Sequence, residues 1–209
     1  MIETRYTGPS AGIVLCVDEL GPESAKSYRG KRLLPARVGT DGPAARATQE
    51  IDYGRRGGGY VSGACRPATG EALTRPYDRR TTANFIDFLT AIDRWLGPVT
   101  EPVALILDNL NVHHAPDVLL FAARHPTWAF VYQPKYAAYL NLIEPWWKIL
   151  RSLALKGRRF ETWAEICQAV ERATTYWNAH KHPFVWGRRR RHRPRRLPGI
   201  ALGANVRPT

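Results

Sequence analysis

Two short runs of apolar residues, each followed directly by an acidic residue, constrain the fold of this chain more than any other feature. Ala11–Val17 leads to Asp18 and Glu19, and Val103–Leu107 leads to Asp108. Continuous apolar runs of this length are typical of strands buried on both faces of a sheet. In open α/β sheets, functional sites form at the carboxyl ends of such strands. The sequence therefore predicts an α/β fold with acids at the ends of central strands.

The segments between and after these runs alternate between strand and helix patterns. Gly-rich and basic residues surround weak strand signals at Lys31–Val38 and a clearer strand at Tyr60–Cys65, which together indicate an antiparallel meander. Helical spacing follows, with Thr81 or Thr82 as the first cap and Gly97-Pro98 as the first stop. The other expected elements are helices at about 115–124, at 144–155 and from Thr162 onward, and a third buried strand at Trp128–Tyr132.

The charge of the chain indicates a polyanionic partner. The 209 residues suffice for one sizeable domain, and their formal net charge is +13, with a pI near 10.2. Seven arginines and no acid fall within positions 188–196. Nucleic acid is the commonest partner of so basic a protein, and arginines that contact phosphates release condensed counterions. A solubilising tail is the alternative for this arginine run.

Cysteine spacing and hydropathy indicate the compartment. The three cysteines, Cys16, Cys65 and Cys167, form no CxxC pair, which argues against a disulfide framework and a zinc site. The sequence has no signal-peptide pattern and no run of 18 apolar residues. We therefore expect a cytoplasmic protein with no membrane partner.

A third acid, Glu144, lies in an apolar and aromatic stretch where a helix begins. The spacing from Asn141 to Glu144 fits a capping box, so Glu144 could serve as a helix cap. It could equally bind a cation, because a carboxylate in apolar surroundings needs compensation. If the two acid-terminated strands are neighbours, Asp18 and Asp108 lie side by side and Glu144 can approach from its helix. Three carboxylates together repel unless cations join them, and oxygen ligands of this kind select Mg²⁺ or Mn²⁺.

Three groups of residues resemble the DDE transposases of the mariner superfamily, in their bacterial insertion-sequence branch. They are Val17-Asp18-Glu19, the segment from Leu105 to His113 that contains Asp108-Asn109, and the segment from Pro134 to Trp147 that contains Leu140-Asn141 and Ile143-Glu144. Between Asp108 and Glu144 lie 35 residues, close to the family's spacing for its second and third acids. The resemblance covers roughly residues 13–182.

This resemblance implies a ribonuclease H-like fold, a mixed sheet flanked by helices. It also implies two Mg²⁺ ions, which Mn²⁺ can replace, and a catalytic and metal-binding triad of Asp18, Asp108 and Glu144. The implied activity is metal-dependent DNA cleavage and strand transfer of an insertion sequence, with element ends and target DNA as partners and a dimer on DNA. A catalytically idle DNA-binding remnant and another ribonuclease H-like nuclease are the alternatives.

Several residues near the triad have expected supporting roles with open alternatives. Adjacent strand residues face opposite ways, so only one of Asp18 and Glu19 can join the cluster, and the family pattern favours Asp18. Asn109 either orients a ligand or closes a turn, and His113 either tunes the site or is structural. Asn141 is a further candidate behind the site, beside its capping role. The expected DNA-contacting residues are Lys135, Lys148, Arg188, Arg189, Arg190, Arg191 and Arg193.

The expected organisation is a lead-in at residues 1–10, a catalytic domain at 11–182 and an Arg- and Pro-rich tail at 183–209. Relatives in the resembling family carry a helix-turn-helix region before the catalytic domain. This sequence starts about ten residues before its first expected strand. We therefore expect a separately encoded helix-turn-helix subunit, or a truncated copy.

Overall fold

The two apolar runs lie side by side in one sheet. In the computed structural model, which describes residues 2–7, 12–26 and 56–184, five strands form a mixed sheet in the order β3-β2-β1-β4-β5. The strands β1, β4 and β5 run parallel, whereas β2 and β3 pair antiparallel and extend the sheet beyond β1. The strands are β1 (Ile13–Ser24), β2 (Gly58–Arg66), β3 (Glu71–Tyr77), β4 (Val103–Leu107) and β5 (Trp128–Tyr132).

The strand β1 is longer than the sequence predicted. We expected it to end before Asp18, but it continues to Ser24 because β2 pairs with it from Cys16 onward. The parallel pairing with β4 does stop early, at Cys16 opposite Ile106. Asp18 therefore lies inside a strand, yet just past the end of the parallel part of the sheet.

The strand β5 is only partly buried, which corrects the expectation of a third fully buried strand. It forms the edge of the sheet beside β4, and only Trp128 among its residues is buried. As an edge strand, β5 needs apolar side chains only where it is covered by the rest of the protein, so its apolar composition did not require full burial. The expected strand at Lys31–Val38 lies outside the described residues.

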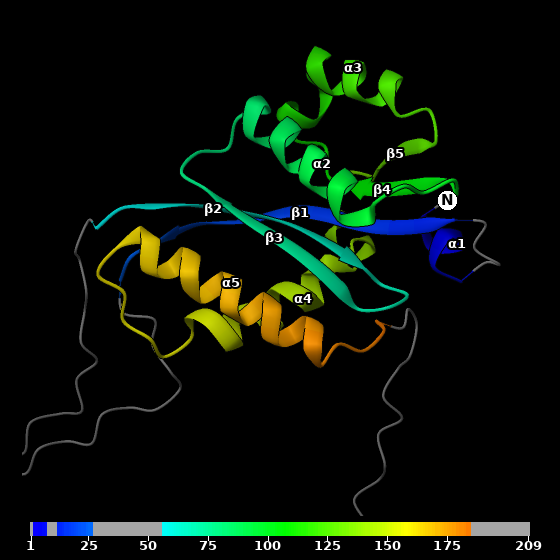
Figure 1. The fold of residues 1–209 in the computed structure, drawn as a ribbon. Coiled ribbons are helices and arrows are strands. Elements are labelled where there is room, and N and C mark those ends of the chain that lie inside the picture. Colours follow the sequence, from blue (N-terminus) through cyan, green and yellow to red (C-terminus); the bar gives the residue numbers. More distant parts are fainter. Residues whose placement is uncertain (1, 8–11, 27–55, 185–209) are drawn as a thin grey trace, which may run out of the picture.

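Helices cover both faces of the sheet (Figure 1). Thr81 caps α2 by accepting a hydrogen bond from the Asn84 N–H, and Gly97 ends that helix, as predicted. Thr162 caps α5 in the same way through the Glu165 N–H. The helical segments are α1 (Ile2–Thr7), α2 (Thr82–Leu96), η1 (Asn111–His114), α3 (Pro116–Arg124), η2 (Ala138–Leu140), α4 (Ile143–Leu150), η3 (Arg151–Leu155) and α5 (Trp163–Ala179).

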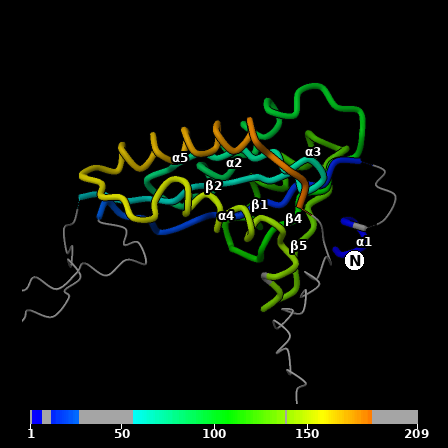
Figure 2. The backbone as a smooth tube through the Cα atoms, turned by 90° about the horizontal axis from the view of Figure 1, so that it is seen from below, coloured from blue at the N-terminus to red at the C-terminus, as the bar shows by residue number. Residues whose placement is uncertain are grey.

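Two hydrophobic clusters fill the space between the sheet and its helices. The cluster under α2 and α3 takes odd-numbered residues of β1 such as Leu15 and Val17, and the cluster under α4 and α5 takes Cys16 and Leu20. Figure 2 shows α5 extending along the sheet, and the α5 residues Thr174 and Asn178 bond Thr74 and Ala72 of β3. Since side chains alternate along a strand, Asp18 faces α4 and Glu19 faces α2.

The expected helix 144–155 is two segments in the structure. The regular helix α4 ends at Leu150 and continues as a π-helical turn, η3, through Leu155. Arg151 at the start of this turn forms an ion pair with the buried Glu23 of β1, with 2.9 Å between Nη2 and Oε1. The turn therefore ties the end of α4 to the same strand that carries Asp18.

The lead-in contains the short helix α1, which contacts the core. Ile2 is buried, and the Tyr6 hydroxyl donates a hydrogen bond to the Leu140 carbonyl at 2.8 Å and lies 3.1 Å from Cys16 Sγ. Tyr6 therefore links the first helix both to β1 and to the segment that precedes α4. No helix among residues 2–7, 12–26 and 56–184 is long and apolar enough to span a membrane.

Candidate active site

Asp18 and Asp108 occupy equivalent places on neighbouring parallel strands. The register pairs Cys16 with Ile106, and each acid comes two residues after its member of this pair. Asp18 is still inside β1, whereas Asp108 directly follows β4. The two carboxylates are close enough that the charge of Asp108 contributes to raising the pKa of Asp18. The strand β1, which contains Asp18, and the strand β4, which precedes Asp108, are therefore neighbours, which was the condition for the acids to lie side by side.

Burial is the main influence on the Asp18 carboxylate. Burial, together with the negative charges of Glu19 and Asp108, raises the pKa of Asp18 from 3.8 to about 7. Hydrogen bonds from the Glu19 backbone N–H and from Trp147 act in the opposite direction. A carboxylate with a neighbouring negative charge and little water is a site where a cation is strongly favoured.

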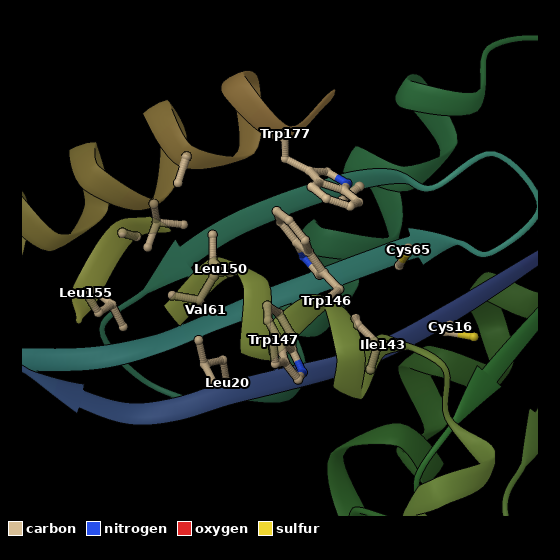
Figure 3. Packing of buried hydrophobic residues seen from close by; sticks show 14 of the residues in the cluster. Cys16, Leu20, Val61, Cys65, Ile143, Trp146, Trp147, Leu150, Leu155 and Trp177 are labelled. Carbon is tan, nitrogen blue, oxygen red and sulfur yellow. The ribbon is translucent and has the colours of Figure 1, made fainter. Parts of the chain in front are cut away.

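Trp147 holds Asp18 from the helix side. Its indole Nε1 donates a hydrogen bond to Asp18 Oδ2 at 3.2 Å. The ring lies against Gly63, which is the residue opposite Asp18 on β2. A Cβ at Gly63 would come within 2.2 Å of the ring, so this position needs a residue without a side chain. Figure 3 shows Trp147 lying over the strands between Leu20 and Ile143.

Asp108 is held by groups from its own loop. Its Oδ1 accepts hydrogen bonds from His113 Nδ1 at 2.9 Å and from the Leu110 backbone N–H at 3.1 Å. Burial acts to raise the pKa of Asp108, but these bonds outweigh it and the pKa is lowered. Among the described residues, both hydrogen bonds to this carboxylate use Oδ1, so Oδ2 is the oxygen left for a further ligand.

His113 joins Asp108 to Glu19. Its Nε2 donates to Glu19 Oε1 at 3.1 Å, and its ring stacks at a tilt on Phe85 with 4.3 Å between centroids. Carboxylates only accept hydrogen bonds, so both ring nitrogens donate. Burial acts to lower the pKa of His113, but the bonds to Asp108 and Glu19 raise it to about 9. His113 is therefore a buried cation between two carboxylates.

Glu144 lies in the first turn of α4, and the segment before it is fastened to β1. Asn141 donates from Nδ2 to the Val17 carbonyl at 3.0 Å and accepts from the Ile143 N–H at 3.3 Å. Leu142 occupies the cap position, and the Glu144 N–H donates to the backbone carbonyl of Asn141 and not to its side chain, so the capping box suggested by the Asn141–Glu144 spacing does not form. Within the described part of the chain, no hydrogen bond or ion pair holds the Glu144 carboxylate.

The remaining expected residues are distributed around these acids. Asn109 donates from Nδ2 to the Gln133 carbonyl, which joins the loop after β4 to the end of β5. Lys135 and Lys148 are exposed, and Lys148 is four residues after Glu144 on the same face of α4. The expected DNA contacts at Arg188, Arg189, Arg190, Arg191 and Arg193 lie outside the described residues.

The donor set fits divalent cations in part. Two neighbouring carboxylates, one of them desolvated, match the hard oxygen ligands that Mg²⁺ and Mn²⁺ prefer. Among the described residues, no three His, Cys, Asp or Glu side chains are grouped closely enough to hold one ion. Asp18 and Asp108 therefore form a preassembled pair, and Glu144 stands apart from it.

Three residues near the pair were not singled out from the sequence. Trp147 was only the last residue of the segment that resembles the family, with no role in the site assigned to it. It is buried and bonds Asp18, and its spacing of three residues from Glu144 was the available signal. Glu19 was considered only as a rival metal ligand. The charge of Arg80 acts to lower the pKa of Asp108, and its guanidinium lies 5.3 Å from the Tyr60 ring centroid; nothing in the sequence pattern marks it.

The sequence of the chain matches the model of a known protein family. The model of a family described as DDE superfamily endonuclease matches residues 13–167, well over half of the chain. A curated relative, the insertion element IS630 uncharacterized 39 kDa protein of Shigella sonnei, is 22% identical over 111 residues. The match covers 53% of this chain and 32% of the relative, so the chain spans about a third of that protein.

Solved structures with the same fold are complexes of the Mos1 transposase. The Mos1 catalytic domain with raltegravir and Mg has a TM-score of 0.55 at 14% identity, covering 88% of this chain and 80% of that one. The Mos1 paired-end complex with the left transposon end has a TM-score of 0.53 at 13% identity, covering 88% and 60%. The mixed five-stranded sheet with its flanking helices is therefore the ribonuclease H-like fold that the sequence predicted.

Proposed function

Because the chain belongs to the DDE superfamily of endonucleases, we propose that it is the catalytic subunit of a DNA transposase. It would cut DNA at the ends of an insertion sequence and join the freed ends to target DNA. The observation that carries the proposal is the pairing of Asp18 and Asp108 beyond the last parallel pair of β1 and β4. Strand transfer itself is the finer part of the proposal, beyond membership of the family.

In this proposal Asp18, Asp108 and Glu144 hold two Mg²⁺ ions, which Mn²⁺ can replace. When bound, such ions neutralise charge on the transferring phosphoryl group and lower the pKa of water. Glu144 would complete the shell of one ion, and its carboxylate has no hydrogen bond or ion pair to break among the described residues. This assignment is supported by the solved Mos1 structures described as complexes with Mg and with Mn.

The protein's own contribution is to fix the two strand carboxylates before DNA arrives. Trp147 orients Asp18 through Oδ2, and His113 orients Asp108 through Oδ1. Asn141 fastens the start of α4 to the Val17 carbonyl, directly before Asp18 in the chain. Groups fixed in this way need little rearrangement when charge develops on the phosphate.

The segment from Lys135 to Tyr139, which we call the rim loop, is the proposed DNA contact next to the site. Its ends are anchored, because the Gln133 N–H donates to the Leu107 carbonyl and Leu140 is buried. Tyr136 is fully exposed at 102% and has a φ of 63°, a conformation that non-glycine residues rarely adopt. Lys135 would contact phosphate, with Lys148 and the arginines of 188–193 as further contacts, and the Tyr136 and Tyr139 rings offer stacking surfaces for unpaired bases.

The remaining expectations belong to the same proposal. The catalytic domain would extend over residues 11–182 and work in the bacterial cytoplasm, as a dimer on DNA, with a helix-turn-helix subunit that reads the element ends. Support comes from the bacterial insertion-element relative and from the Mos1 complexes named for paired transposon ends. Both relatives are longer than this chain, so DNA recognition by additional segments fits their length.

The test is an assay of strand cleavage and strand transfer on a duplex that carries the element end. We expect nicking with Mg²⁺ or Mn²⁺ and joining of the freed 3′ end to a target plasmid, and no product with a chelator. Binding without cleavage in every metal would favour an idle DNA-binding remnant. Cleavage of an RNA–DNA hybrid or a junction without strand transfer would favour another ribonuclease H-like nuclease.

A further inference from the structure

A buried pair of charged side chains lies behind the strand carboxylates. The side chain of His113 is 0% exposed and that of Glu19 is 4% exposed, and they contact each other through Nε2 and Oε1 at 3.1 Å. Glu19 Oε2 is also buried and has no hydrogen-bond partner among the described residues. Burying a charged pair costs more free energy of solvation than a well-packed apolar pair of similar size would. The pair therefore needs a reason other than stability.

The geometry separates Glu19 from the ligands while connecting it to one of them. Asp18 and Glu19 are adjacent in β1 and face opposite sides of the sheet. Glu19 lies opposite Ser62 of β2 on the α2 side, where Phe85 covers the His113 ring. From that side it reaches Asp108 only through the imidazole, which donates to Asp108 Oδ1 at 2.9 Å.

We propose that Glu19 and His113 are positioning residues for Asp108, and that Glu19 is not a metal ligand. Glu19 fixes the plane of the imidazole, and the imidazole fixes the Asp108 carboxylate through Oδ1 so that Oδ2 is left for the cation. This inference rests on the proposed function, because it assumes that Asp108 binds a cation. It decides between the two adjacent acids of β1: Asp18 is a ligand, and Glu19 acts on Asp108 through the His113 imidazole.

The hydrogen bonds around Asp108 resist rotation of its carboxylate. The Leu110 backbone N–H and the imidazole both bond Asp108 Oδ1, so rotation of the carboxylate would break two hydrogen bonds. Without Glu19, the imidazole Nε2 would lose its partner, and the ring would be held only by the Nδ1 contacts with Asp108 and by packing on Phe85. Partners of this kind, one bond removed from a ligand, typically change metal affinity by about 10- to 100-fold when they are replaced.

The experiment titrates Mn²⁺ alone into the full chain and follows free Mn²⁺ by electron paramagnetic resonance, for the wild type, Glu19→Gln and Glu23→Gln. Glu19→Gln keeps the size and one acceptor oxygen but removes the charge. Glu23→Gln is the matched control, because Glu23 is also a buried acid of β1 but bonds Arg151. We expect about 10-fold weaker Mn²⁺ binding in Glu19→Gln and wild-type affinity in Glu23→Gln.

Two further measurements make each outcome decisive. Thermal unfolding with a chelator separates loss of fold from loss of positioning, and His113→Asn, which removes the bridge, should weaken Mn²⁺ binding at least as much as Glu19→Gln. Wild-type Mn²⁺ affinity in Glu19→Gln would overturn the inference, and so would equal weakening in both glutamine variants. Mn²⁺ binding needs no DNA, so a wild-type protein that binds Mn²⁺ but does not cleave contradicts the proposed function and leaves this test intact.

Discussion

The strand carboxylates and the helix carboxylate of the candidate site are held in opposite ways. Asp18 and Asp108 each accept a hydrogen bond from a buried ring N–H, of Trp147 and His113 respectively. The carboxylate of Glu144 has no such partner among the described residues, and only the backbone before it is fastened to β1. One half of the site is thus built in advance, and the other half is adjustable.

The two halves also differ in the free energy that each costs the folded protein. The strand half carries its cost in the folded protein, as a desolvated Asp18 with a raised pKa and a buried charged pair at Glu19 and His113. Among the described residues the helix half shows no such cost, and its cost would arise when the Glu144 carboxylate binds an ion. This contrast between the two halves leads to four predictions.

The largest expected effect is on catalysis, where the two halves should be equally necessary. Asp108→Asn and Glu144→Gln should each lower Mg²⁺-dependent cleavage by at least about a thousand-fold, because each removes a ligand charge. The measurement is the rate of strand cleavage on an element-end duplex, with circular dichroism to verify folding. Unchanged cleavage in either folded variant would refute the role of that residue.

The next largest effect should come from the packing under Trp147. Gly63→Ala adds a methyl group where the indole ring lies, and overpacking of this kind costs about 1–3 kcal/mol of unfolding free energy. Urea denaturation measures the loss. In a Trp147→Leu background the ring is gone, so the same alanine should cost less; equal costs in both backgrounds would contradict the contact.

A smaller effect isolates the hydrogen bond to Asp18. Trp147→Phe keeps an aromatic ring but removes the N–H, and should lower unfolding free energy by about 1 kcal/mol and slow cleavage. Trp146→Phe is the control, since Trp146 is equally buried but its Nε1 has no hydrogen-bond partner among the described residues. The prediction fails if the two variants cleave DNA at the same rate.

The smallest effect concerns pH in the metal-free protein. The pKa of Asp18 rises from 3.8 to about 7 on folding, so its ionisation destabilises the folded state as pH increases through that window. Asp18→Asn should therefore raise the melting temperature relative to the wild type by a few degrees at pH 8 and by less at pH 5. Glu144→Gln is the comparison, and we expect little change from it at either pH.

The sequence predicted the sheet well because its signals were local and strong. Two apolar runs ending in acids specified β1 and β4, and the caps at Thr81 and Thr162 specified where α2 and α5 begin. It was wrong about the end of β1, because pairing with β2 carries the strand past Asp18. It was wrong about β5 because edge and central strands can share an apolar composition.

The candidate site was predicted less completely, for a physical reason. The strand acids could be identified from their place after apolar runs, and the resemblance supplied Glu144. The groups that hold them come from distant parts of the chain: Trp147 reaches Asp18 across 129 positions, and His113 reaches Glu19 across 94. No local pattern encodes such contacts, since they depend on how α4 and η1 pack against the sheet.

The contact made by Tyr6 has a practical consequence for how the protein is shortened or tagged. Its hydroxyl bonds the Leu140 carbonyl, four residues before Glu144, and lies against Cys16, two residues before Asp18. Trimming α1 would therefore loosen a support shared by both halves of the site, although no acid is touched. Amino-terminal truncations that stop short of β1 should be judged against Tyr6→Phe before any lost activity is attributed to missing DNA-binding segments.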